Sequence, residues 1–243
     1  MDNLGELERK LVLWLQEKVG QAGARGAVVG LSGGLDSAVV AVLCKKAFPE
    51  GTLALIMPCH SMGEDETHAQ LLAERFGIPY RRVVLDDVYD KMLATLTADI
   101  DGDKVLSLAR ANLKPRLRMI TLYFYAAQLN YLVVGTGNRS EIAVGYFTKY
   151  GDGGVDLLPL GNLVKGEVLA LAFHLGIPKE IINKPPSGGL WPGQTDEAEM
   201  GITYRDLDAY LKGCEIDPGV QARIEDMHYK SRHKRKRPPV PQF

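Results

Sequence analysis

The segment Ser32-Gly33-Gly34-Leu35-Asp36-Ser37 constrains the fold of this chain more than any other stretch. It follows the apolar run 27–31 and precedes the apolar run 38–43, a pattern typical of a strand, a tight glycine turn and a helix. Adjacent glycines let the backbone adopt positive φ and approach a ligand closely. The helix that follows offers free N–H groups at the positive end of its dipole. The segment therefore predicts an anion site suited to phosphate or pyrophosphate.

Asp36 distinguishes this turn from a P-loop. No Gly-Lys-Ser/Thr sequence follows the glycines, so no P-loop lysine reaches a terminal phosphate. A bare carboxylate in an anion site repels phosphate, and a cation between the two removes the conflict. We therefore expect a metal ion at Asp36. The six-residue pattern resembles the loop of the ATP pyrophosphatases, which split ATP into AMP and pyrophosphate.

The order of expected elements indicates the fold class. Strands are expected at 27–31, 52–57, 80–85 and 131–134, and helices at 4–20, 36–47, 64–76, 86–97, 104–129 and 163–175. Such alternation predicts an α/β fold, with a parallel β-sheet flanked by helices on both faces. The expected architecture is Rossmann-like, of the adenine nucleotide alpha hydrolase type. Pro115 lies inside the long helix and should kink it or begin a new helix there.

Residues 1–243 are expected to form one domain, with an ATP pyrophosphatase core at about 26–180. The segment 184–200 is rich in proline and glycine and is expected to be mobile. The C-terminal stretch 230–243 begins with a basic run and is expected to act as a lid over phosphorylated substrates.

Composition and charge exclude several classes of protein. The formal net charge is −1, and six Lys and Arg residues gather at 230–237, so the remainder of the chain is acidic. This balance argues against a nucleic-acid-binding domain. The chain has no apolar run of 18 residues, which argues against a membrane protein. The three cysteines, Cys44, Cys59 and Cys214, match no metal-site spacing and favour a reducing cytoplasmic location.

A second glycine-rich segment, Gly135-Thr136-Gly137-Asn138-Arg139-Ser140-Glu141, follows the strand at 131–134. Carboxyl ends of parallel strands share one edge of a sheet, so both glycine segments can face one site. Mg²⁺ binds one or two carboxylates together with substrate phosphates, and Asp36 with Glu141 fits that count. Alternatively, Glu141 stabilises a helix N-terminus through the helix dipole. The residues alone leave both interpretations open.

Six further segments of the chain resemble segments of one known family and occur in the same order as they do there. Together with the two glycine segments, the chain resembles the NH3-dependent NAD synthetase family of the N-type ATP pyrophosphatases. The segments that carry this resemblance are Asn112-Leu113-Lys114-Pro115-Arg116-Leu117-Arg118-Met119, Phe147-Thr148-Lys149-Tyr150-Gly151-Asp152-Gly153-Gly154, Leu158-Pro159-Leu160, Pro186-Ser187-Gly188-Gly189-Leu190, Gln194-Thr195-Asp196-Glu197 and His233-Lys234.

The resemblance implies a ligase that forms a C–N bond. Deamido-NAD (nicotinic acid adenine dinucleotide) is activated by ATP as an acyl-adenylate and then amidated by ammonia to NAD, the final step of NAD biosynthesis. Mg²⁺ is the implied cofactor and ATP the co-substrate. In this resemblance Asp36 and Glu141 bind the metal, and Asp36, Lys149 and Asp152 are the catalytic candidates. The implied ATP contacts are Gly30, Leu31, Ser32, Gly33, Gly34, Leu35, Asp36, Ser37, Thr136, Lys165 and Ser187. The implied deamido-NAD contacts are Arg116, Lys149, Asp156, His233 and Lys234.

The resemblance also implies a homodimer with the helical region 104–129 at its interface. Members of the family that use glutamine carry an amidase domain, for which this chain has no room, so free ammonia is the expected nitrogen donor. Neither nucleic acid nor membrane is an expected partner. Two alternatives are a tRNA-modifying ATP pyrophosphatase, whose basic tail touches RNA, and a non-catalytic adenine-nucleotide-binding module. The first leaves the segment 149–156 unexplained, and the second would not need two carboxylates in glycine loops.

Overall fold

The computed structural model of the chain describes residues 3–191 and 193–242. Its centre is one parallel sheet in the order β3-β2-β1-β4. The strands are β1 (Ala27–Gly30), β2 (Thr52–Ile56), β3 (Tyr80–Arg82) and β4 (Leu132–Val134). The chain adds β2 and β3 on one side of β1 and then returns to place β4 on the other side. The strand order therefore reverses between β1 and β4, where sheets of this kind bind ligands.

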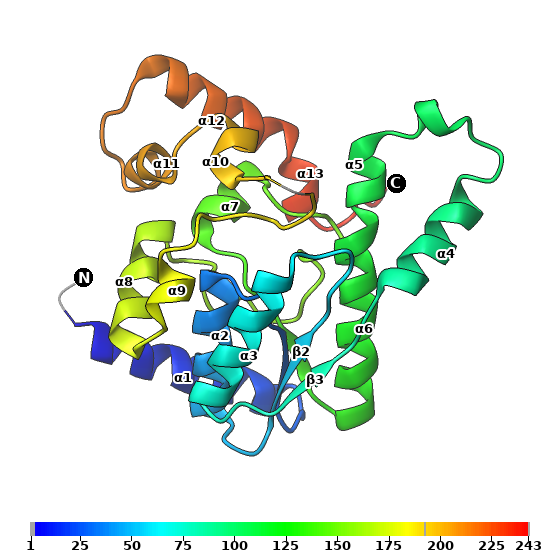
Figure 1. Cartoon of the computed structure of the whole chain (residues 1–243). Helices are drawn as coiled ribbons and strands as arrows, with labels where there is room; N and C mark the ends of the chain where they lie inside the picture. Colours follow the sequence, from blue (N-terminus) through cyan, green and yellow to red (C-terminus); the bar gives the residue numbers. More distant parts are fainter. Residues whose placement is uncertain (1–2, 192, 243) are drawn as a thin grey trace.

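Helices surround the sheet (Figure 1). The helices predicted before residue 104 and at 163–175 are all confirmed to within two residues. The helices are α1 (Leu4–Gln21), α2 (Leu35–Ala47), α3 (Gly63–Arg75), α4 (Asp86–Leu96), α5 (Ser107–Ala111), α6 (Leu113–Leu129), α7 (Arg139–Val144), α8 (Lys165–Leu175), α9 (Lys179–Ile182), α10 (Asp196–Met200), α11 (Tyr204–Leu211), α12 (Pro218–Lys230) and α13 (Arg232–Arg235), with a short 3-10 helix at Gly102–Lys104.

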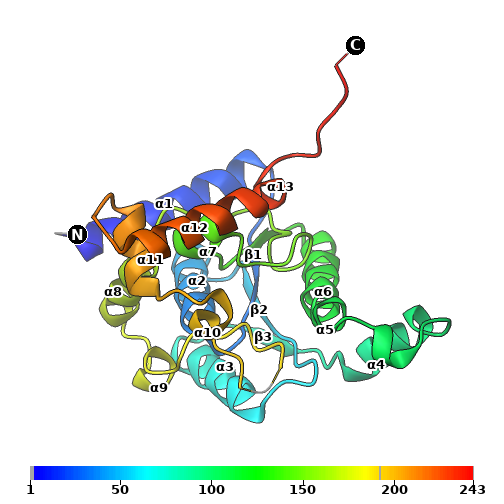
Figure 2. The ribbon, with the colours of Figure 1, turned by 90° about the horizontal axis from the view of Figure 1, so that it is seen from above.

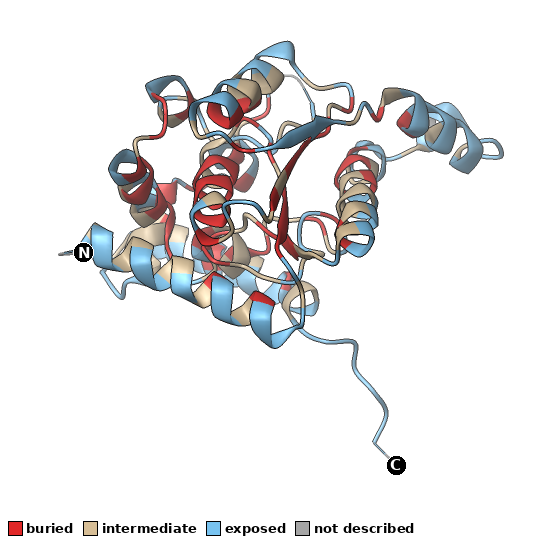
Figure 3. Ribbon diagram, turned by 90° about the horizontal axis from the view of Figure 1, so that it is seen from below, coloured by how far each residue is buried: buried red, intermediate tan, exposed pale blue. Residues whose placement is uncertain are grey.

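Both faces of the sheet are buried, as predicted. Alternation along β1 sends Val29 to a core formed with α1, α2, α3, α8 and α9, and Val28 to a second core formed with α4 and α6. Figure 1 shows α2 and α3 on one side of the strands and α6 on the other. The helix α2 is buried along most of its length (Figure 3), which matches its nearly continuous apolar sequence.

The prediction of one helix over 104–129 is wrong. α5 ends at Ala111, Asn112 is shared by both helix ends, and α6 begins at Leu113. Pro115 is the third residue of α6, where its missing N–H leaves no helical hydrogen bond unmade. In a continuous helix its ring would clash with the carbonyl of Ala111. The expected effect of Pro115 is therefore confirmed, as the start of a new helix.

The structure differs from the prediction at two further places, the end of β3 and the segment 184–200. β3 ends at Arg82 instead of residue 85, and all three of its residues are exposed at the sheet edge. The last five residues of the segment 184–200 form the helix α10.

A third apolar cluster lies apart from the sheet and joins α7, α10, α11 and α12. Its buried side chains are Val144, Met200, Ile202, Tyr204, Leu207 and Ile224. This cluster holds the C-terminal third of the chain against the helix that follows β4. Among the described residues, no helix combines the length and the apolar character that crossing a bilayer requires.

Candidate active site

The glycine turn after β1 has the geometry that the sequence predicted, with one restriction. Only Gly33 adopts positive φ, at +79°, and a Cβ there would lie 2.1 Å from the carbonyl oxygen of Asp65. Gly34 is the N-cap of α2 and has extended backbone. Ser32 and Ser37 face each other across the turn, with 3.0 Å between their hydroxyl oxygens. The turn thus opens directly onto the N-terminus of α2, whose first N–H groups have no helical acceptors.

Asp36, Glu141 and Lys165 meet between the carboxyl ends of β1 and β4. Lys165 Nζ donates to Asp36 Oδ2 and lies 3.7 Å from Glu141 Oε1. The three side chains are 9–17% exposed. They come from the first turns of α2, α7 and α8. The two glycine segments therefore do face one site, and a lysine ammonium group lies between their carboxylates.

Burial and mutual charge shift the pKa values in this cluster. Burial raises the pKa of Glu141 to about 8, and the neighbouring carboxylate of Asp36 adds to the increase. Burial by itself lowers the pKa of Lys165, but Asp36 and Glu141 together raise it above its ordinary value. The lysine therefore stays charged, and the cluster has a strong preference for a cation beside its carboxylates.

The surrounding helices fix these three side chains. Asn138 Nδ2 donates to Asp36 Oδ1 at 3.1 Å. Asn138 is also the N-cap of α7, where it and Glu141 form a reciprocal capping box. Glu141 therefore stabilises the start of α7 and also faces the cluster that contains Asp36, and its binding of a metal ion stays a prediction. Asp208 of α11 accepts hydrogen bonds from the backbone N–H groups of Lys165 and Gly166, at 3.3 and 2.7 Å, and so anchors the start of α8.

A second group of predicted residues gathers around the loop after α7 and is rich in cations. Lys149 Nζ donates to the carbonyl of His233 at 3.0 Å, and Lys234 Nζ donates to the carbonyls of Gly145 and Phe147. Arg116 approaches the carbonyl of Lys149 at 3.4 Å. Asp152, on the same loop, accepts from the backbone N–H of Thr148 at 2.9 Å. The structure therefore brings together Arg116, Lys149, Asp152, His233 and Lys234.

Asp156 makes its side-chain hydrogen bonds outside both groups. Its Oδ2 accepts from the backbone N–H of Val133 at 2.8 Å, and its Oδ1 accepts from the hydroxyl of Tyr123 at 2.9 Å. One carboxylate oxygen of Asp156 is thus bound to β4 and the other to α6. Its contact with a dinucleotide remains a prediction.

The segment with Ser187 is attached to the glycine turn through Asp65. Lys184 pairs with the Asp65 carboxylate, and the Asp65 carbonyl packs on Gly33. The Ser187 hydroxyl accepts from the N–H of Gly189 and is exposed. Gly135 and Thr136 continue β4 towards the same edge of the sheet, where Gly135 N–H donates to the carbonyl of Leu157.

Four residues without a predicted role also shape this edge. Arg118 donates to the carbonyl of Met57 and to the hydroxyl of Ser61. Lys114, which is buried, donates to the carbonyl of Leu190. The third and fourth are Tyr204 and Asp196, which are both buried beside Glu141 and Lys165. Lys114, Arg118 and Asp196 stand in segments that carry the family resemblance, and no local pattern singles out Tyr204.

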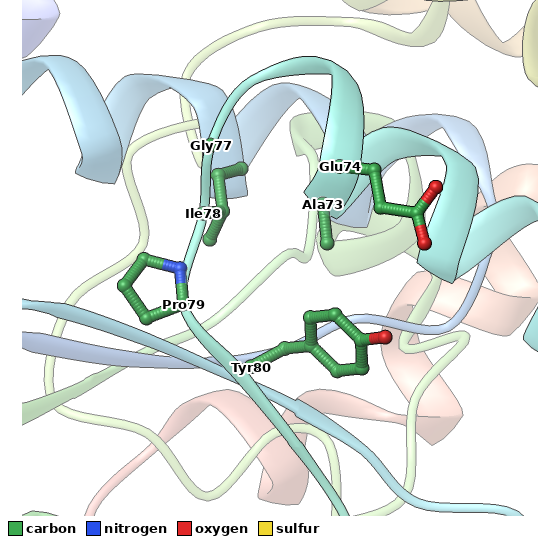
Figure 4. Close-up of a pocket in the computed structure, with 6 residues that line it drawn as sticks. All are labelled: Ala73, Glu74, Gly77, Ile78, Pro79 and Tyr80. Carbon is green, nitrogen blue, oxygen red and sulfur yellow. The ribbon is translucent and has the colours of Figure 1, made fainter.

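A surface hollow of about 390 Å³ lies elsewhere, between α3 and β3 (Figure 4). It is lined by Ala73, Glu74, Gly77, Ile78, Pro79 and Tyr80. These residues run from the end of α3 to the first residue of β3, so the hollow is at the amino end of that strand. Ligands of such sheets bind at the carboxyl ends of the strands, and the hollow offers no cluster of catalytic groups.

Comparisons with known proteins identify relatives over the whole chain. A sequence model of the NAD synthase family matches residues 7–238. The NH(3)-dependent NAD(+) synthetase of Carboxydothermus hydrogenoformans is 54% identical over 239 residues, 98% of each protein. The structure of NMN synthetase from Francisella tularensis superposes with a TM-score of 0.95, at 41% identity and over 100% of both chains. The NH3-dependent NAD synthetase of Campylobacter jejuni, solved with nitrate ion, has a TM-score of 0.82 at 30% identity, again over 100% of both chains.

Replacing Lys165 with methionine should destabilise the metal-free protein by about 3–5 kcal/mol, because two buried carboxylates lose their cation. The measurement is urea unfolding in the presence of a chelator. Lys212→Met is the matched control, since the Lys212 side chain is 48% exposed and lies 3.4 Å from Glu167. The control should cost less than about 1 kcal/mol. Equal losses in the two variants would contradict the assigned role of Lys165.

Proposed function

Because the chain belongs to the NAD synthase family, we propose that it uses ATP and ammonia to amidate deamido-NAD, with NAD, AMP and pyrophosphate as products. The observation that carries the proposal is the convergence of Asp36, Glu141 and Lys165 beside a glycine turn that opens onto a helix N-terminus. That combination suits an enzyme that holds ATP phosphates and stabilises a pyrophosphate leaving group.

The reaction has two steps. In the first, a nicotinate carboxylate oxygen attacks the α-phosphorus of ATP, the bond to pyrophosphate breaks, and an acyl-adenylate forms. In the second, ammonia attacks the acyl carbon, the bond to AMP breaks, and the amide nitrogen releases its surplus proton. N–H groups of the segment 30–37 bind the departing pyrophosphate. Lys165 lies beside Asp36 of the same segment, and its positive charge can balance the negative charge that develops on the pyrophosphate.

The residues present also fit a magnesium ion. Asp36 and Glu141 supply two carboxylates, and the ammonium of Lys165 already lies between them, so the donor set favours a hard cation. When bound, Mg²⁺ neutralises charge on the ATP phosphates. Asn138 orients the Asp36 carboxylate for this role through its side-chain hydrogen bond.

The cationic group around residues 145–154 supports binding of deamido-NAD. The phosphates and carboxylate of this substrate are anionic, and Arg116, Lys149 and Lys234 provide positive charge on one side of the active-site edge. Lys149 is the candidate for contact with the nicotinate carboxylate. Lys234, fixed by two carbonyls, anchors the basic stretch, and we expect residues 230–243 to close over bound substrate.

A second candidate function is amidation of the mononucleotide analogue of deamido-NAD. One observation favours it: the similarity to the Francisella tularensis NMN synthetase extends over the whole chain with a TM-score of 0.95. The chemistry at the carboxylate is the same in the two reactions. The candidates differ only in whether the chain gains binding energy from the AMP half of the dinucleotide.

The proposed assembly is a homodimer with α6 at the interface. Ile120 and Phe124 on α6 are 58% and 64% exposed, and Leu106 and Leu108 nearby are 73% and 58% exposed. The arm formed by α4 and α5 projects from the body of the molecule beside α6 (Figures 1 and 2). An exposed apolar surface of this kind is typical of a protein interface.

A substrate comparison tests the proposed function. With ATP, Mg²⁺ and ammonium, the purified chain should convert deamido-NAD to NAD with equal amounts of AMP and pyrophosphate. The kcat/KM for deamido-NAD should exceed that for nicotinic acid mononucleotide by about tenfold or more, an effect of about 1.4 kcal/mol from the AMP half. The reverse preference would establish the second candidate. Formation of ADP, or equal activity with glutamine and no ammonium, would contradict the proposal.

The dimer has a separate test. Phe124→Glu places a charge in the proposed interface and should halve the molar mass measured by light scattering. Phe173→Glu is the matched control, since Phe173 is 57% exposed and belongs to α8, a helix on the other side of the sheet from α6 (Figure 1). The control should keep the wild-type mass. A wild-type monomer, or a dimer that survives Phe124→Glu, would exclude this interface.

A further inference from the structure

The C-terminal end of α7 is bound by basic side chains from α12 and α13, which cross over it (Figure 2). The last carbonyl groups of a helix have no partners within the helix itself. In α7, the carbonyl of Ala143 accepts from His228 Nδ1 at 2.7 Å. The carbonyl of Ile142 accepts from Arg235 Nη1 at 3.2 Å, and Lys234 Nζ donates at 2.8 Å to the carbonyl of the C-cap residue. Basic groups at this end of a helix also interact favourably with its dipole.

These contacts matter because α7 is short. Its six residues form fewer than two turns, and a helix of that length is not stable without tertiary contacts. The backbone at its end also lies close to the junction of α12 and α13. Gly145 has a φ of +69°, and a Cβ there would lie 2.1 Å from the Cβ of Ser231. The position of α7 is therefore determined from outside the helix, by residues 228–235.

Arg235 joins three parts of this region. Its Nη1 donates to the carbonyl of Ile142 in α7 and, at 2.7 Å, to the hydroxyl of Ser231 between α12 and α13. Its Nη2 donates to the carbonyl of His228 in α12. A planar guanidinium, with donors on separate nitrogens in a fixed geometry, suits such a set of acceptors better than an ammonium group does. Arg235 thus ties the end of α7 to both helices of the C-terminal region.

The opposite end of α7 carries groups of the active-site edge. Asn138, its N-cap residue, donates to Asp36 Oδ1 at 3.1 Å, and Glu141 completes the capping box. The carbonyl that binds Arg235 belongs to Ile142, the next residue after Glu141. A shift of α7 therefore moves the carboxylate of Glu141 relative to that of Asp36.

We propose that Arg235 is a positioning residue for the step that consumes ATP. It holds α7, and with it Glu141, in the place that the reaction requires, and in this role it does not touch substrate. The part that Glu141 takes in that step belongs to the proposed function, on which this inference rests. The basic run at 230–237 therefore does more than attract anionic substrates, because one of its members fastens a helix of the active site from the far end.

The first test measures the step that consumes ATP. Exchange of labelled pyrophosphate into ATP, with deamido-NAD and without ammonium, reports that step alone. For Arg235→Met we expect the rate at saturating substrates to fall about tenfold or more, because small displacements of aligned groups cause losses of this size. The Mg²⁺ concentration for half-maximal exchange should rise. The KM for ATP should change little, because the hydrogen bonds described for Arg235 lie outside the glycine turn at 30–37. A lower melting temperature with an unchanged rate and Mg²⁺ requirement would overturn the proposal.

Amide hydrogen exchange of the ligand-free protein gives a second measurement, which does not depend on activity. The N–H of Gly145 donates to the carbonyl of Ile142, and the N–H of Tyr146 donates to that of Glu141, so both amides report on the end of α7. Arg235→Met should speed their exchange about tenfold through a loss of local stability, while the amides of α2 keep their wild-type rates. Unchanged exchange at these two amides would overturn the proposal.

Two further variants serve as controls. Arg25→Met is the matched one, because Arg25 Nη2 donates at 3.0 Å to the carbonyl of Leu129, the last residue of α6, at the amino end of the sheet. It loses the same type of contact and should keep the wild-type kinetics. Arg235→Lys keeps the charge but offers one nitrogen where the guanidinium uses two, so its rate should lie about threefold below the wild type. The same loss in Arg25→Met, or full activity in Arg235→Lys, would overturn the proposal.

The variant Arg235→Lys also decides the question if Arg235→Met does not fold, since it retains the charge at the end of α7. The proposed function fails separately, if the wild type shows no pyrophosphate exchange that depends on deamido-NAD. In that case the amides of Gly145 and Tyr146 still determine whether Arg235 holds α7 in place.

Discussion

The contact of Lys165 with Asp36 and Glu141 is the interaction on which the rest of the active-site edge depends. Each of the three side chains belongs to the first turn of a different helix, α2, α7 or α8. Two carboxylates at such close range, largely removed from water, repel each other unless a cation lies between them. The lysine supplies that cation before any ligand arrives. The helices that carry the ligand-binding groups are therefore already in position, which reduces the cost of ordering them on binding.

The strand order explains why these residues meet. β1 and β4 are neighbours at the point where the strand order reverses, which is where ligands of such sheets bind. Gly33 closes the first turn against Asp65, where no side chain fits. The third apolar cluster then places Tyr204 against Glu141, and Asp208 of α11 anchors the start of α8. The C-terminal third of the chain thus completes a site that the sheet begins.

Much of this could be predicted from the sequence, because periodicity and glycine turns are local signals. The parallel sheet and its ligand-binding edge were predictable from two apolar runs, 27–31 and 52–57, and from the turn at 32–37. The pairing of Lys165 with Asp36 spans 129 positions, and no local pattern reveals it. Read by itself, Lys165 resembles a solvated lysine at a helix start. The same holds for Tyr204, whose importance comes from a contact with Glu141 across 63 positions. The break in the predicted helix over 104–129 has a local cause, since α6 begins at Leu113 and Pro115 is its third residue.

The central claim is that this edge of the sheet activates a carboxylate by attack on the α-phosphorus of ATP. The most direct measurement uses deamido-NAD labelled with ¹⁸O in its nicotinate carboxylate, followed by mass spectrometry of the products. The account predicts one ¹⁸O in the phosphate of AMP for each turnover and none in pyrophosphate. Unlabelled AMP, or label in pyrophosphate, would contradict it.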